Sequence, residues 1–169
     1  VTPYAKKQKG AIWSKQKIDL NNSFTYDMWL WLGDHNGTYG DDTAASDGIA
    51  FLLQNDGNQA IGTPGGGLGA YSYGVENASS SQRYKYVKNA LAIEMDSWWN
   101  NISNLPAERF DYDVPQAAEK VGHTGFVQPK DTGNNSNLGH LAAWYDPSNM
   151  IANAHWRLFS VKWEPNVHW

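Results

Sequence analysis

One short stretch carries most of the side chains that could do chemistry: residues 89–100, Asn-Ala-Leu-Ala-Ile-Glu-Met-Asp-Ser-Trp-Trp-Asn. Read with a period of two, it predicts a β-strand whose successive side chains point to opposite faces. Glu94 and Asp96 then share one face, with their side chains about 6–7 Å apart. That face also carries Ala92, Trp98 and Asn100, and the opposite face, predicted to pack in a core, carries Leu91, Ile93 and Met95.

Two acids side by side on a strand have three possible explanations. A bound metal ion cancels their mutual repulsion. A glycosidase also needs a pair of carboxyl groups, which stand about 5–5.5 Å apart when one is the acid and the other the nucleophile. The third explanation is an exposed strand face with scattered charges. The spacing alone leaves all three open.

The composition limits the class of protein. A chain of 169 residues is one domain, long enough to bury a sizeable core. Sixteen glycines, with 14% aromatic and only 18% charged residues, favour an aromatic-rich all-β protein over a helical bundle. The net charge of −4 argues against a nucleic-acid partner, because no basic field exists to displace counterions. No apolar run approaches the ~20 residues of a membrane span, so we expect no membrane insertion.

Further stretches with a period of two indicate other strands. The clearest cover residues 24–32 and 155–163, and shorter ones are expected at 10–14, 18–20, 123–127 and 138–144. Many short strands separated by turn residues are typical of a sandwich or barrel. We therefore predict an all-β fold, a two-layer jelly-roll sandwich of antiparallel sheets.

Two loops, one directly before a predicted strand and one between strands, contain residues that are suited to binding a ligand. Asp47 and Gly48 stand directly before an apolar run, and Gly62–Gly69 contains three consecutive glycines. Consecutive glycines let a backbone approach a ligand closely and leave N–H groups free to donate. A phosphate-binding loop is excluded, because no Gly-Lys-Ser/Thr follows and no helical pattern begins there. Leu68 within the run predicts a fixed turn that packs into a core.

Three motifs together resemble the legume-type (L-type, concanavalin-like) lectin domain, in its bacterial surface-protein branch. They are Ser46-Asp-Gly-Ile-Ala-Phe51, Gly65-Gly-Gly-Leu-Gly69, and Ala92-Ile-Glu-Met-Asp-Ser-Trp-Trp-Asn100 followed by His123-Thr-Gly-Phe126. The resemblance covers residues 10–163. It implies a jelly-roll sandwich whose function is calcium-assisted binding of glycans, without catalysis.

The resemblance also implies a role for individual residues in sugar binding. Asp47 matches an acid that accepts from sugar hydroxyls, after a Ser46–Asp47 peptide that is expected to be cis. The turn at Gly66 and Gly67 matches a backbone donor. The amide of Asn100 is expected to donate to a hydroxyl, and the Trp98 ring matches an aromatic on which sugar stacks.

A calcium site is implied beside the sugar. Its ligands would be Asp96, Asn100, the Trp98 carbonyl and one of Asp111 or Asp113, of which we prefer Asp111. The chain departs from the family here, since Asp111 lies eleven residues after Asn100 and His123 another twelve further on. Glu94 and His123 match ligands of a second, transition-metal site, and otherwise would simply form hydrogen bonds.

Two other functions remain as alternatives. A family 16-like glycoside hydrolase needs the pattern Glu-x-Asp-x-(x)-Glu on one strand, but Trp98 and Trp99 occupy the place of the second Glu. A structural adhesin module with a degenerate sugar site is the second alternative, against which the joint presence of Asp47 and Asn100 argues. We expect residues 1–169 to form a single extracellular or cell-surface lectin-like domain that lacks the last C-terminal strands of its relatives.

Overall fold

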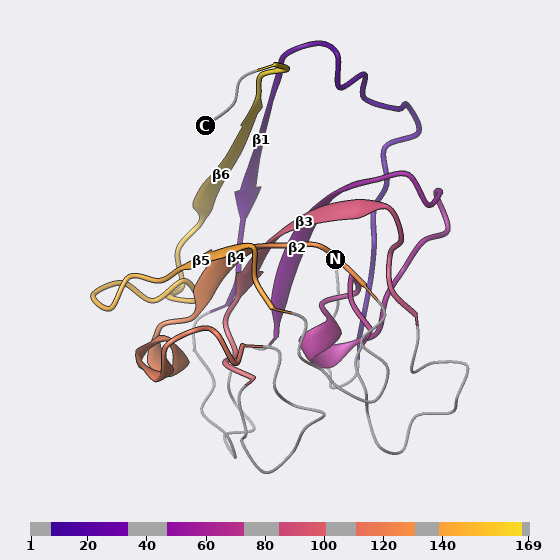
Figure 1. Ribbon diagram of the computed structural model, residues 1–169. Coiled ribbons are helices and arrows are strands. Elements are labelled where there is room, and N and C mark those ends of the chain that lie inside the picture. The colour runs from indigo at the N-terminus through magenta and orange to yellow at the C-terminus, as the bar shows by residue number, and fades with distance from the viewer. Residues whose placement is uncertain (1–7, 34–46, 73–84, 101–110, 131–138, 167–169) are drawn as a thin grey trace.

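A computed structural model describes residues 8–33, 47–72, 85–100, 111–130 and 139–166 (Figure 1). The described elements are almost entirely strands, as predicted: β1 (Phe24–Leu30), β2 (Gly48–Gln54), β3 (Ala90–Asp96), β4 (His123–Val127), β5 (Ala142–Trp144) and β6 (Arg157–Trp163). Two short 3₁₀ helices, η1 (Gly65–Gly67) and η3 (Gln116–Lys120), accompany them. Within these ranges the structure contains no helix with the length and apolar character needed to cross a membrane.

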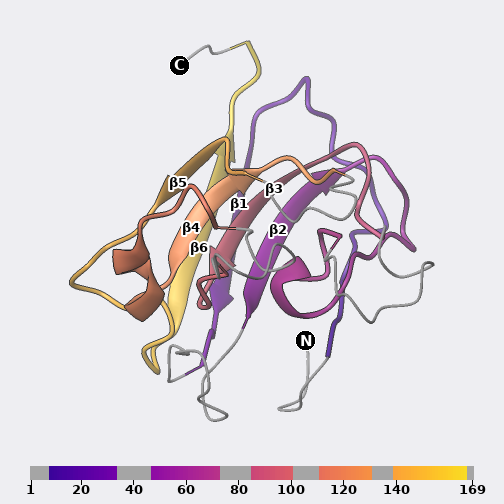
Figure 2. The same cartoon turned by 60° about the horizontal axis from the view of Figure 1, so that its bottom comes forward.

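The strands form two antiparallel sheets, which confirms the predicted sandwich. One sheet has the order β2-β3-β4-β5, and the other is the pair β1-β6 (Figures 1 and 2). Aromatic rings join the two layers, because Phe51 of β2 lies 5.4 Å from Tyr26 of β1 and 5.6 Å from Phe159 of β6, centroid to centroid. Such tilted ring pairs are a favourable way to fill the space between sheets.

The opposite face of the four-stranded sheet is also covered. Ala92 of β3 and Val127 of β4 pack there with Ala70 and Tyr71, which belong to the loop that follows η1. Ala92 is fully buried, and it lies on the same face of β3 as Glu94 and Asp96. The interpretation of this face as an exposed surface with scattered charges is therefore wrong.

The predicted extent of several strands needs correction. Residues 10–14 and 18–20 form no strand, and the first of these segments is held instead by a side chain, since Trp13 Nε1 donates to the Ala60 carbonyl at 2.9 Å. β3 ends at Asp96 rather than at residue 100. Oδ1 of Asp96 accepts from the backbone N–H of Trp98 at 2.7 Å, an Asx-type turn that bends the chain away from the sheet. Trp98 and Asn100 consequently lie beyond the strand.

The glycine-rich loop is a fixed turn, as predicted. Gly65–Gly67 form η1, and Leu68 closes it with a φ of 49° while its N–H donates to the Gly65 carbonyl. The side chain of Leu68 packs against the core on the covered face of the sheet. The turn thereby stands over the end of β3 at which Glu94 and Asp96 are found.

Candidate functional site

A group of buried polar side chains lies where β3 ends and β4 begins. Glu94 and Asp96 come from β3, and His123 opens β4 directly opposite Asp96. Asp111 and Asn100 join them from the chain that follows β3, and all five side chains belong to residues at most 5% exposed. Burying charged groups is costly unless they are paired or bind an ion. So dense a polar group therefore indicates a function rather than a structural core.

Two hydrogen bonds, one to its carboxylate and one from its backbone N–H, tie Asp111 to Asn100 just beyond the end of β3. Its carboxylate accepts from the N–H of Asn100, and its own N–H donates to the Asn100 carbonyl at 3.0 Å. Asp113 lies outside the group, with one carboxylate oxygen 2.8 Å from Nδ1 of His140 and the other accepting from the His140 backbone N–H at 2.7 Å. Of the two acids that the sequence offered, the structure therefore brings Asp111 to Asn100.

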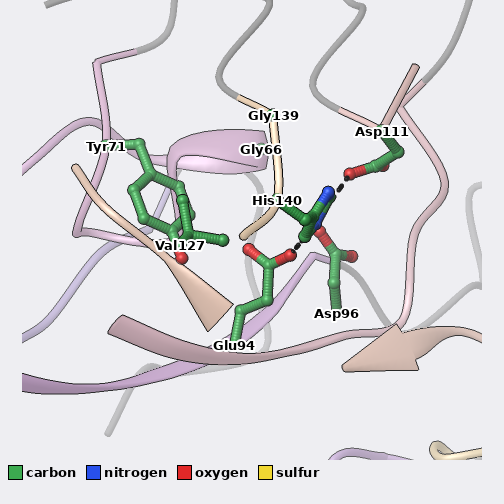
Figure 3. A pocket seen from close by; sticks show the side chains of 8 residues that line it. All are labelled: Gly66, Tyr71, Glu94, Asp96, Asp111, Val127, Gly139 and His140. Carbon is green, nitrogen blue, oxygen red and sulfur yellow. Dashed lines mark hydrogen bonds and ion pairs between the residues drawn. The ribbon is translucent and has the colours of Figure 1, made fainter. Parts of the chain in front are cut away.

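Two histidines face the carboxylates. Nε2 of His123 lies 3.4 Å from Oε1 of Glu94 and 3.3 Å from Oδ1 of Asp111. Nε2 of His140 contacts the same Glu94 oxygen and lies 3.9 Å from Oδ1 of Asp111 (Figure 3). One ligand atom from each of these four residues lies within 4.8 Å of all the others.

His140 is a site residue that the sequence did not reveal to us. The available signal was Gly125, a glycine inside β4, because a glycine in a strand often marks the close approach of another group. A Cβ at Gly125 would stand 2.4 Å from Cδ2 of His140. The imidazole therefore occupies the space that a side chain on β4 would fill.

The acids and histidines change one another's pKa values. Burial raises the pKa of Asp96 well above its ordinary value, and the charge of Asp111 adds to the effect. Burial also raises the pKa of Asp111. For Glu94 burial acts in the same direction, but contacts with His123 and His140 outweigh it and lower its pKa to about 2. Burial thus disfavours the charged forms of both aspartates, and the contacts with His123 do not offset it.

The residues present fit a bound cation. Among the described residues, Oδ1 of Asn100 and both ring nitrogens of His123 are buried without a hydrogen-bond partner. Buried polar atoms of this kind are rare in folded proteins, and each costs free energy. Carboxylate and amide oxygens suit calcium, whereas imidazole nitrogen suits transition metals. A cation would satisfy these atoms and offset the repulsion among the aspartates.

Asp47 and Asn100 lie on either side of the glycine turn. A Cβ at Gly65 would stand 3.8 Å from Oδ2 of Asp47, and one at Gly66 would stand 3.0 Å from Oδ1 of Asn100. The carbonyl of Asp47 accepts from both the N–H and the hydroxyl of Ser97, at 2.8 and 2.9 Å. Burial, and to a lesser extent Asp111, raise the pKa of Asp47 to about 6.

Gly67, Trp98 and the Ser46–Asp47 peptide were also predicted to contribute to sugar binding. Gly67 is buried, and its carbonyl accepts from the N–H groups of Ala70 and Tyr71, so it contributes to closing the turn. Trp98 is partly exposed beyond the Asx-type turn. Ser46, and with it the Ser46–Asp47 peptide, lies outside the described residues. The roles assigned to these positions remain predictions.

A comparison with known families identifies the chain. The family model of the legume lectin beta-barrel domain matches the sequence over residues 1–169. The chain belongs to this lectin family. Carbohydrate binding is the general property of such domains, and L-type lectins generally bind metal ions. The resemblance of the three motifs to the L-type lectin domain is thereby confirmed, and the bacterial surface-protein branch stays a prediction. The buried polar group of the lectin domain lies beside the glycine turn, where the strand of the third motif ends.

Proposed function

We propose that this lectin domain binds a glycan in a calcium-braced site and does no chemistry on it. Asp47 accepts from sugar hydroxyls, the turn at Gly66 and Gly67 donates from its backbone, Asn100 donates from its amide, and Trp98 packs on the sugar face. The calcium ligands in this proposal are Asp96, Asn100, the Trp98 carbonyl and Asp111.

The observation that carries the proposal is the position of the Asn100 amide. Its Oδ1 is buried without a hydrogen-bond partner among the described residues, and a Cβ added at Gly66 would stand only 3.0 Å from it. An amide can coordinate an ion through its oxygen and donate to a hydroxyl through its nitrogen at the same time. This arrangement supports the proposed role of Asn100 as the link between a metal ion and a sugar bound beside the glycine turn.

The backbone supports this link. Two hydrogen bonds join Asn100 and Asp111: the Asn100 N–H donates to the Asp111 carboxylate, and the Asp111 N–H donates to the Asn100 carbonyl. An ion held by Asp111 therefore fixes the segment that presents the Asn100 amide. Calcium commonly takes six to eight oxygen ligands at 2.3–2.6 Å, and carboxylate, amide and carbonyl oxygens all suit it.

The absence of catalysis in the proposal rests on Glu94. A glycosidase of this general architecture would use Glu94 at the surface of the sheet together with a second carboxyl group. Glu94 is instead buried, and its carboxylate contacts His123 and His140. β3 also ends at Asp96, so no further acid extends the pair along the strand.

Asp47→Asn is the direct test. Hydrogen bonds to a charged acceptor contribute about 1.5–3 kcal/mol, so this substitution should weaken glycan binding at least tenfold while the fold stays intact. Asp56→Asn is the matched control, because Asp56 is an exposed acid just beyond the opposite end of β2. Binding is measured on a glycan array and then by titration with the best glycan, with calcium and with chelator.

Three results would contradict the proposal. Equal binding by the Asp47→Asn and Asp56→Asn variants would exclude Asp47 as the sugar acceptor. New reducing ends after incubation with β-glucans, lost in Glu94→Gln, would indicate a hydrolase. Neither binding nor turnover across a broad panel would leave a structural adhesin module with a degenerate sugar site.

A further inference from the structure

We propose that a groove at the edge of β5 is a second contact site for carbohydrate, where Trp144 packs on a sugar ring and Asp113 accepts from its hydroxyls. The groove has a volume of about 250 Å³. Residues 113–115 line one side of it, and His140 with residues 143–145 lines the other. The inference goes beyond the proposed function, because none of these residues belongs to the sugar site described above.

The first wall of the groove is a fixed turn. The N–H of Val114 donates to the Asp111 carbonyl at 3.0 Å, and Nε1 of Trp99 donates to the Val114 carbonyl at 3.2 Å. Val114 is buried, and Pro115 leads directly into η3, where its carbonyl accepts from the N–H of Ala118 at 2.9 Å. These hydrogen bonds hold the wall in place without any ligand.

The second wall is β5, the last strand in the order β2-β3-β4-β5 (Figure 1). Trp144 pairs with Thr124 of β4, yet its side chain is 63% exposed. Ala143 is also exposed, and Tyr145 is half-buried. A large ring on a paired strand therefore leaves most of its surface available to a ligand.

A double contact between Asp113 and His140 joins the two walls. Nδ1 of His140 lies 2.8 Å from one carboxylate oxygen of Asp113, and the His140 backbone N–H donates to the other at 2.7 Å. The side chain of His140 is only 4% exposed, whereas that of Asp113 is 29% exposed. The contact fixes the width of the groove, and a preformed site loses less free energy when its ligand binds.

The chemistry of the groove suits a sugar. An ionised carboxylate offers about four acceptor positions, of which His140 uses two, so Asp113 can accept from two further hydroxyls. Sugars also have apolar C–H faces, which a Trp ring covers. The groove is smaller than the roughly 300–1,000 Å³ of sites for drug-sized ligands, so it suits a single sugar unit of a longer glycan.

An ammonium group is the main competitor, because it is attracted to both a carboxylate and an indole ring. Carbohydrate binding is the general property of the family to which the chain belongs, and this favours the sugar. The proposed function also assigns the same pair of groups to its own sugar, with Asp47 as the acid and Trp98 as the ring.

Nuclear magnetic resonance of isotope-labelled protein tests the inference directly, because each indole N–H gives its own signal. Trp144→Phe and Trp29→Phe identify the two signals that are compared. The probes are cellotetraose, mannotetraose, galactotetraose and chitotetraose, added one at a time to calcium-loaded protein. At least one should shift the Trp144 signal until it saturates. The Trp29 signal should not move, although this ring on the outer face of β1 is 64% exposed.

Two variants connect the signal to the groove. Trp144→Ala should weaken binding of the active sugar at this site about tenfold or more, as is common when a central aromatic contact is removed, and Trp29→Ala is the matched control. Ala143→Arg places a long side chain in the groove but leaves Trp144 and Asp113 unchanged. It should abolish the shift of the Trp144 signal.

The outcomes separate this inference from the proposed function. If none of the four sugars shifts the Trp144 signal, or if Ala143→Arg leaves the shift unchanged, the inference is overturned. A shift with choline but with no sugar would replace it with a cation site. A Trp144 shift combined with equal array binding by wild type and Asp47→Asn rejects only the proposed function. Weaker array binding by Asp47→Asn without a Trp144 shift rejects only the groove.

Discussion

In most proteins apolar side chains are buried and charged side chains are exposed, but two regions of the lectin domain show the opposite. At the junction of β3 and β4, charged residues such as Asp96 and Asp111 are almost completely buried. On the outer face of the β1-β6 pair, Trp29 is 64% exposed and its register partner Leu158 is 56% exposed. Trp31 and Trp156 extend this apolar face beyond the strands, with ring centroids 5.8 Å apart.

The difference between the regions shows what distinguishes a site from an unusual surface. The buried polar group has further features that indicate a ligand: unpaired polar atoms, a histidine oriented by an acid, and a glycine that makes room for it. The exposed apolar face shows no further feature of this kind among the described residues, and only its exposure is unusual. Large exposed patches often mark interaction surfaces, but nothing in the described structure identifies what would cover this one.

Removal of metal should produce the largest change, and only at the buried polar group. A ligand present at a hundredfold excess over its dissociation constant adds about 2.7 kcal/mol to the free energy of unfolding. Chelator should therefore lower the melting temperature by roughly 5–10 °C in a domain of this size. Scanning calorimetry with and without calcium measures the shift. An unchanged melting temperature would mean that the buried acids are stable without an ion.

Asp96→Asn should have opposite effects in the two metal states. Without metal, a neutral side chain removes a buried charge and its repulsion with Asp111, so stability should rise by about 1–2 kcal/mol, within the range found when buried ionic groups are replaced. With calcium, the lost ligand should make the variant less stable than the wild type. Urea unfolding in both states, with Asp56→Asn as control, checks the reversal. The same sign in both states would contradict a metal role for Asp96.

Lowering the pH should weaken glycan binding but increase the contribution of Asp47 to stability. Its folded-state pKa is raised from 3.8 to about 6, so between these values the folded protein binds more protons than the unfolded chain. The contribution of Asp47 to stability therefore increases as the pH falls through this window. Binding, measured in calcium-loaded protein, needs the charged carboxylate and should fall about tenfold per pH unit once the pH lies below the folded-state pKa of Asp47. Titrations at pH 4 to 7 on wild type and Asp47→Asn test both trends, and parallel pH profiles of the two proteins would contradict them.

The smallest effect is expected on the outer face of the β1-β6 pair. Exposed side chains away from special features usually change stability by no more than about 0.5 kcal/mol, so Trp29→Ser and Leu158→Ser should unfold at nearly the same urea concentration as wild type. Glycan binding should not change. A loss above about 1 kcal/mol would show that this face is covered in solution, and the comparison between the two regions would then fail.

The sequence predicted the fold better than the site because strand alternation is local. β1, β4 and β6 lie within the predicted segments, but the expected strands at 10–14 and 18–20 do not form. Their apolar residues, such as Ile12 at 80% exposed, find no partner strand among the described residues. Strand propensity needs a neighbour to be realised, and the sequence does not specify that neighbour.

Within the site, the sequence by itself placed Glu94 and Asp96 on one face of a strand, since a period of two holds wherever the strand packs. It also marked the glycine run as a fixed turn, because Leu68 within it needed a core. Tertiary structure alone decided that this face is buried, that Asp111 rather than Asp113 meets Asn100, and that His140 joins from the segment before β5. These outcomes depend on contacts between residues separated by 11 to 46 positions, for which the local pattern of side chains carries no signal.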